Sequence, residues 1–114
     1  MQYALLVYAP TQDSDRASRP VPGDIAALLG RPDVTGWARL HAAESATTLR
    51  NDEGRMLLTD GPFIESKEYL VGLILIEAGN LDVALASAEE LLQQTQPGTA
   101  IEVRPVLDKH FRGA

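Results

Sequence analysis

The sequence predicts an α+β fold, and three observations along the chain support this assignment. Residues 2–9 and 69–77 are short apolar runs rich in β-branched and aromatic side chains, which is typical of buried strands. Residues 81–92 carry leucine and alanine at helical spacing behind Asn80, a good N-cap residue. Residues 100–106 alternate between apolar and charged side chains, which indicates a strand with one wet face.

The first predicted strand is apolar on both of its faces. One face carries Tyr3, Leu5 and Val7, and the other carries Ala4, Leu6 and Tyr8. The polar residues 11–22 then form a predicted surface loop, and Pro22 stands where a first-turn proline begins a short helix that ends at Gly30.

A second short helix is predicted to begin at Pro32. Val34, Trp37, Ala38 and His41 lie at positions i, i+3, i+4 and i+7, and therefore on one helical face. We interpret His41 on that face as a partly buried packing residue, with a catalytic base as the less favoured alternative.

Residues 45–50 and 56–59 are predicted to pair as a β-hairpin. The intervening Asn-Asp-Glu-Gly, residues 51–54, has the composition of a tight turn. In the later strand over 69–77, Gly72 indicates a bulge or the close approach of another element.

The order of these elements favours a ferredoxin-like βαββαβ sandwich with an inserted β-hairpin. In that arrangement the helices cover one face of the sheet only. Because the strands over 2–9 and 69–77 are apolar on both faces, the second face would be an apolar patch larger than monomers usually expose. We therefore expect a homodimer in which two chains pack sheet against sheet.

Composition bounds the class of protein. The chain has 114 residues, 16 acidic and 10 basic side chains, a net charge of -6 and no cysteine, which fits one domain over 1–108 with a polar tail at 109–114. The lack of cysteine excludes disulfides, thiolate zinc sites and a cysteine nucleophile, and fits a cytoplasmic location. Net acidity with only two lysines argues against nucleic-acid binding. No signal peptide, membrane span, metal site or cofactor motif is expected.

The densest cluster of reactive side chains is the segment Asp60-Gly61-Pro62-Phe63-Ile64-Glu65-Ser66-Lys67-Glu68. One interpretation is a rigid turn between two strands in which Phe63 is a buried anchor. The other is a turn that holds Asp60, Glu65, Lys67 and Glu68 close together at the mouth of a cleft, so that one carboxylate serves in acid–base chemistry. The spacing favours the structural interpretation, because ion-pair networks also shift pKa values.

This segment resembles the signature of YCII-related proteins of the DGPF type, with Ile64 in place of the commoner alanine. The resemblance extends to the opening Tyr-Ala-Leu-Leu-Val-Tyr, to residues 46–50, to Gly72 and to residues 102–106. It implies a dimeric α+β barrel built from ferredoxin-like protomers. It implies no assigned reaction, and some relatives are associated with extracytoplasmic-function sigma factors.

The wider family is described as enzymes on the basis of a His and an Asp in an Asp-Pro-Tyr motif that line a cleft. Here Gln96-Pro97-Gly98 stands where Asp-Pro-Tyr would be expected, so the second member of the dyad is absent. His41 lies in roughly the first region, but the dyad is not carried over to this chain.

Arg50 and Arg104, both in predicted strands, are the remaining candidates. An Arg fork binds a carboxylate or phosphate well, although an internal ion pair with Asp60, Glu65 or Glu102 is the favoured interpretation of both arginines. We expect a small polar or anionic ligand between sheet and helices, near Asp60, Phe63, Glu65 and Lys67, in a binding protein or an enzyme of unknown reaction. The alternative is a non-catalytic dimeric module that contacts a regulator such as a sigma factor.

Overall fold

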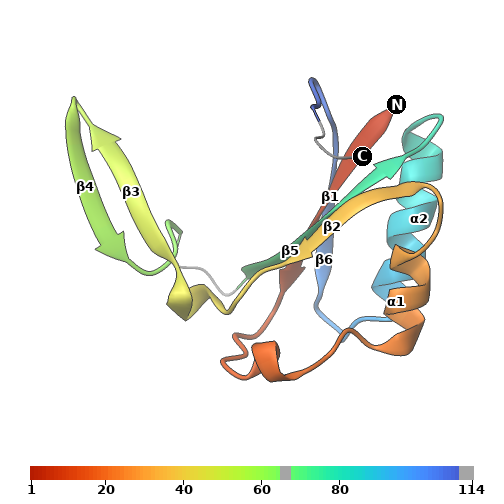
Figure 1. Ribbon diagram of the computed structural model, residues 1–114, viewed down its shortest axis with the longest axis horizontal. Coiled ribbons are helices and arrows are strands. Elements are labelled where there is room, and N and C mark those ends of the chain that lie inside the picture. Colours follow the sequence, from red (N-terminus) through yellow and green to blue (C-terminus); the bar gives the residue numbers. More distant parts are fainter. Residues whose placement is uncertain (65–67, 111–114) are drawn as a thin grey trace.

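In the computed structural model, the chain forms a four-stranded antiparallel sheet, two helices and a separate two-stranded sheet (Figure 1). The structure describes residues 1–64 and 68–110. The strands are β1 (Gln2–Ala9), β2 (Val34–Arg39), β3 (Thr47–Asp52), β4 (Arg55–Asp60), β5 (Tyr69–Glu77) and β6 (Ala100–Pro105). The helices are α1 (Gly23–Leu29) and α2 (Leu81–Gln93), with short 3₁₀ turns η1 (Arg16–Ser18) and η2 (Ala43–Ser45).

The main sheet has the strand order β2-β5-β1-β6, and every neighbouring pair is antiparallel. Both helices lie on the same side of this sheet (Figure 1). This arrangement confirms the predicted α+β class and is compatible with a ferredoxin-like fold.

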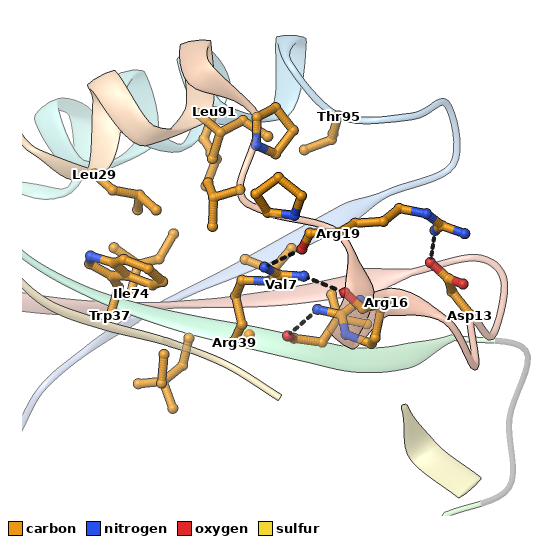
Figure 2. Close-up of a pocket in the computed structure, with 18 residues that line it drawn as sticks. Val7, Asp13, Arg16, Arg19, Leu29, Trp37, Arg39, Ile74, Leu91 and Thr95 are labelled. Carbon is orange, nitrogen blue, oxygen red and sulfur yellow. Dashed lines mark hydrogen bonds and ion pairs between the residues drawn. The ribbon is translucent and has the colours of Figure 1, made fainter. Parts of the chain in front are cut away.

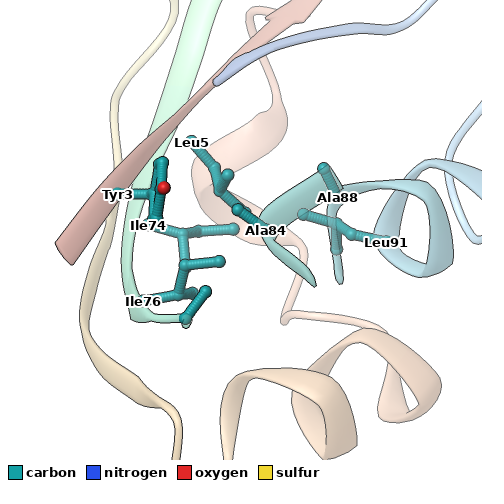
Figure 3. Close-up of a cluster of buried hydrophobic side chains, with 8 residues drawn as sticks. Tyr3, Leu5, Ile74, Ile76, Ala84, Ala88 and Leu91 are labelled. Carbon is teal, nitrogen blue, oxygen red and sulfur yellow. The ribbon is translucent and has the colours of Figure 1, made fainter. Parts of the chain in front are cut away.

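The core lies between the central strands and α2 (Figure 3). Its fully or nearly buried members are Tyr3, Leu5, Ile74 and Ile76 from the sheet, Ala78, and Ala84, Ala88 and Leu91 from α2. The small alanines let α2 approach the sheet closely, and three side chains of α1, those of Ile25, Leu28 and Leu29, pack at the margin of the cluster.

Asn80 begins α2 as expected. Its side-chain Oδ1 accepts a hydrogen bond from the backbone N–H of Val83 at 3.0 Å, which satisfies one of the unpaired amides in the first turn. The predicted helix over 81–92 is therefore confirmed to within one residue.

The predicted second helix beginning at Pro32 is wrong, because this segment forms the edge strand β2. The register between β2 and β5 shifts between Val34 and Gly36, so that Val34 lies opposite Ile76 and Trp37 opposite Ile74. The extra residue in this bulge brings positions i and i+3 to the same face of the strand. In the sequence, that spacing is indistinguishable from one turn of a helix.

Gly72 lies beside this strand at a close backbone approach. A Cβ atom on Gly72 would meet the carbonyl oxygen of Ala38 at 3.0 Å. A register shift between Val7 and Tyr8 of β1 lies opposite the same part of β5. Both features predicted for this glycine, a bulge and a close approach, are present.

The face of the sheet opposite the helices, called here the open face, carries an apolar strip. Since Tyr3, Leu5 and Val7 pack in or against the core, the alternating side chains of β1 point to the other side. The strip comprises Ala4, Leu6 and Tyr8 from β1 and Leu70, Leu73 and Leu75 from β5. Neither helix covers it (Figure 1).

The β3–β4 hairpin forms its own sheet and extends away from the main sheet (Figure 1). All but one of its strand residues are exposed, and the exception, Thr48, is partly exposed. Leu49, Met56 and Leu58 lie on one face with exposed fractions of 63%, 63% and 69%. An isolated two-stranded hairpin is at best marginally stable in water. The exposed apolar face of this hairpin is therefore a surface that contact with another element or chain would stabilise.

Candidate functional site

A cavity of about 300 Å³ lies between the main sheet, α1 and the loop that joins β1 to α1 (Figure 2). We call it the helix-side cavity. Its inner wall is apolar and includes Val7, Ile25, Leu29, Trp37 and Leu91. Its mouth carries the cations of Arg16, Arg19 and Arg39 together with the carboxylate of Asp13.

Two of these arginines fasten the loop to the sheet edge through backbone carbonyls. Arg16 donates from Nε to the Leu40 oxygen at 2.6 Å and from Nη2 to the Val71 oxygen at 3.0 Å. Arg39 donates from Nη1 to the Arg19 oxygen at 2.9 Å and from Nη2 to the Arg16 oxygen at 2.8 Å. The two side chains thus hold each other's segments in place.

Arg19 has a different partner. Its Nη1 forms an ion pair with the Asp13 carboxylate, and its side chain is 61% exposed. Because a solvent-exposed ion pair contributes little to stability, this contact can open at small cost.

The charged form of the Arg16 guanidinium is disfavoured by its surroundings. Its burial, followed by the neighbouring charge of Arg39, lowers the pKa of Arg16 below its ordinary value, while Asp13 acts in the opposite direction. A second anion at this mouth would act in the same direction as Asp13 and favour the charged form of Arg16.

None of these three arginines was a predicted site residue. Arg16 and Arg19 belong to the polar loop without hydrophobic period, and the sequence pattern predicts a helix around Arg39 where the structure has strand β2. Their convergence depends on hydrogen bonds between residues 20 to 55 positions apart, which no local pattern reports. The sequence offers one signal, Arg16 and Arg19 just before Pro20 and Pro22, and nothing in it links Arg39 to them.

A second cavity of about 520 Å³ lies beside residues 62–64 and Glu68, on the open-face side of β1. We call it the turn cavity. Tyr8, Tyr69 and Leu70 line one wall, and Phe63 and His41 line others. The described residues that line it are mainly apolar. A polar cleft near this turn stays a prediction, because Glu65 and Lys67 lie outside the described residues.

The predicted site residues of the turn are only partly brought together. The Arg50 guanidinium lies over the Phe63 ring, 5.2 Å from its centroid, in cation–π geometry. Phe63 is 65% exposed, so its predicted role as a buried anchor is wrong. It follows Gly61, whose φ of 104° lies in the left-handed region that favours glycine. Asp60 ends β4 opposite Thr47.

Glu65 and Lys67 lie outside the described residues. Their predicted participation in a cluster with Asp60 therefore stays a prediction. Two hydrogen bonds fix the entrance of the turn, from Thr48 Oγ1 to the Gly61 oxygen and from the Gly61 N–H to the Ala46 oxygen, both 2.7 Å.

Arg104 lies outside the lining of both cavities, whereas His41 lines the turn cavity. Arg104 on the edge strand β6 forms an ion pair with Glu102 at 3.1 Å, which is one of the internal pairs considered for it. His41 is exposed, because its segment follows a strand and not a helix, so its predicted partial burial is wrong.

Within residues 1–64 and 68–110, no group of three or more His, Asp or Glu side chains is placed to hold a metal ion. No helix in the same residues is long and apolar enough to cross a membrane.

Comparison with known proteins identifies relatives but no activity. The model of the YCII-related domain matches residues 1–109. An uncharacterized protein of Rhizobium meliloti (strain 1021) is 42% identical over 69 residues, which are 60% of this chain and 56% of that protein. The match thus spans about half the length of that relative. Because the family match covers nearly the whole sequence, the chain belongs to the YCII-related family.

Proposed function

We propose that this protein binds a small organic molecule in the helix-side cavity, as a binding protein or as an enzyme that uses acid–base chemistry. The observation that carries the proposal is the combination of an apolar chamber of about 300 Å³ with three arginines at its mouth. Ligand sites are commonly concave and mostly apolar, with a few converging polar groups.

A screen of metabolites by thermal shift tests this function. A ligand that binds only the folded state raises the melting temperature, and filling the cavity abolishes that effect. Ile25→Phe fills the cavity from α1, while Leu81→Phe enlarges a 48%-exposed side chain on α2 and serves as the control. If stabilising metabolites act equally on both variants, the ligand lies elsewhere.

The turn cavity is a second location for a ligand. Its lining includes Pro62 and Phe63 of the Asp-Gly-Pro-Phe tetrapeptide, and Arg50 stacks on Phe63, which supports this location. The tetrapeptide itself supports assignment to the DGPF type. Asp60→Asn and Lys67→Ala test it. If both changes lower the melting temperature of the free protein and leave every ligand shift intact, the turn is a structural element.

We also propose a homodimer in which the open faces of two sheets pack together as a dimeric α+β barrel. The apolar strip of six side chains on the open face supports it, since soluble monomers rarely leave such strips in water. Sedimentation of the wild-type protein as a monomer at micromolar concentration would exclude this arrangement.

The alternative function is a non-catalytic interaction module. The exposed Leu49, Met56 and Leu58 on one face of the β3–β4 hairpin favour it, because they form a projecting apolar surface. The partner in this alternative would be a regulator such as an extracytoplasmic-function sigma factor, and the two proteins would interact in the reducing cytoplasm. Loss of partner binding in Leu58→Ser, with all ligand shifts preserved, would support this role.

A further inference from the structure

We infer that the ligand of the helix-side cavity is an amphipathic organic anion, with a carboxylate or phosphate head group at the arginines and a compact apolar body inside. This inference rests on the proposed small-molecule function and adds the chemical class. It follows from the charge balance at the mouth, the unused guanidinium donors and the apolar chamber behind them (Figure 2).

The charge balance at the mouth is positive in an otherwise acidic protein. Three arginines and one carboxylate, that of Asp13, line the cavity, so the local charge is 3 − 1 = +2, against -6 for the whole chain. Arg16 and Arg39 donate to backbone carbonyls, which are neutral acceptors. Two guanidinium charges are therefore gathered without a matching carboxylate in the cavity lining.

The guanidinium groups retain donors for an anion. Each guanidinium has five N–H groups. Arg16 uses two of its five in the hydrogen bonds described above, and Arg39 also uses two of its five. Because these bonds fix both side chains, an anion would find donors whose orientation is already set. Planar, preorganised donors bind carboxylate or phosphate more tightly than flexible ones.

The chamber behind the arginines selects the body of the ligand. Leu29 and Leu91 line it from the helices, and Trp37 offers its ring beside Ile74 (Figure 2). A volume of about 300 Å³ is at the small end of ligand cavities. The chamber therefore suits a single ring or a medium alkyl chain, and an inorganic anion would leave it unfilled.

Asp13 acts as an internal competitor for the head group. Its carboxylate forms the exposed ion pair with Arg19, so an incoming anion must displace it or bind beside it. Removing the Asp13 charge is therefore expected to strengthen anion binding, whereas removing the Arg19 charge is expected to weaken it.

The test compares 3-phenylpropanoate, 2-phenylethyl phosphate and the neutral 3-phenylpropanamide on the full chain. Trp37 is the single tryptophan of the protein and lines the cavity, so its fluorescence reports binding directly. We expect the two anions to bind about tenfold or more tightly than the amide, as is typical of hydrogen bonds to charged groups. The tighter of the two anions identifies the head group.

Two variants of opposite effect and one control complete the design. Arg19→Gln should reduce anion affinity several-fold and leave the amide unchanged, while Asp13→Asn should increase anion affinity. Arg31→Gln removes an arginine of similar exposure, 45%, that pairs with Glu90 outside the cavity lining, and should leave both affinities unchanged. Arg16 and Arg39 are left intact because they hold the loop.

The outcomes separate the chemical class from the function itself. If the amide binds as tightly as the anions, or if Asp13→Asn weakens anion binding, the inferred class is wrong while the small-molecule function stands. If no probe changes Trp37 fluorescence or the melting temperature, and the Ile25→Phe variant gives the same response as wild type to every metabolite, the proposed function fails as well.

Discussion

Arg39 shows how one residue both shapes the candidate site and holds the fold around it. Its guanidinium bridges the carbonyl oxygens of Arg16 and Arg19, which belong to the loop between β1 and α1. The side chain that supplies positive charge to the cavity mouth therefore also fixes the loop that forms the mouth. Charge and architecture are coupled at this position.

We expect replacement of Arg39 to cause a measurable loss of stability. Arg39→Met removes both hydrogen bonds while keeping the aliphatic stem, and we expect a decrease of about 1–2 kcal/mol in the free energy of unfolding, since the group is exposed and solvent compensates in part. Urea denaturation measures it. Arg31→Met, which breaks a surface pair with Glu90, is the control and should change little. Equal losses in the two variants would contradict the role of Arg39.

We expect the contribution of Glu77 to the stability of the protein to depend on pH in the acid range. Hydrogen bonds from the N-terminal amine, then Gln2 and then Lys109, lower the pKa of Glu77 from 4.5 to about 2. Because the folded pKa is below the ordinary value, the contribution is present above about pH 4.5 and is lost as pH falls toward 2. Its size is small, since the group is exposed and screened by water.

The measurement is the melting temperature of wild type and Glu77→Gln between pH 2 and pH 6. The variant should be less stable than wild type near neutrality, and the difference should shrink as pH falls through the interval from 4.5 to 2. A difference that is constant with pH would mean that the carboxylate of Glu77 contributes through packing and not through its charge.

At the scale of elements, the sequence predicts best where one local pattern has one structural meaning. The stripe of α2 and the apolar runs of β1 and β5 satisfy this condition, and all three are confirmed. Segment 34–39 does not, because the bulge beside Thr35 places Val34 and Trp37 on one face at helical spacing. Only pairing with β5, more than 30 residues later, decides the structure of this segment.

The candidate site was predicted less well than the fold for the same reason. Loop residues carry no period, and the arginines converge only because η1 lies against the ends of β2 and β5. The turn signature identifies Asp60 and Phe63 as candidates, but it does not show that both side chains are exposed. Their exposure depends on the course of the hairpin, which is set by tertiary structure. Local chemistry can suggest reactive residues, but it cannot place them in one cavity.

The N-cap of α2 gives a prediction at this scale. Asn80→Ala removes the acceptor for the Val83 amide and should lower the free energy of unfolding by about 1 kcal/mol. Asn80→Asp keeps the acceptor and adds a charge that the helix N-terminus favours, so it should retain wild-type stability. Chemical denaturation followed by circular dichroism measures both. Equal destabilisation by Ala and Asp would contradict a capping role.

For the whole molecule, the distribution of apolar surface is the decisive feature. The helices cover one side of the sheet, while the leucines of the open face are partly exposed and those of the hairpin are exposed. A domain of 114 residues has little core to spare, so apolar side chains placed outside it are more readily explained by a second copy than by monomer stability. The helix-side cavity lies on the other side of the sheet and stays accessible in such a dimer.

The proposed dimer predicts that a charge in the middle of the open face separates the two copies. Leu73 lies between Leu6 and Ala38 across the strands, and Leu73→Lys would place an ammonium group between two facing sheets. Glu102, which lies on the same face opposite Leu6, is already paired with Arg104. We expect this variant to sediment as a monomer under conditions where wild type is a dimer, with circular dichroism unchanged because its long stem can reach water in the monomer. Leu81→Lys, at an exposed position at the start of α2, is the control and should remain a dimer. If Leu73→Lys is folded and still dimeric, the open face is not the interface, and the exposed hairpin face becomes the surface to mutate next.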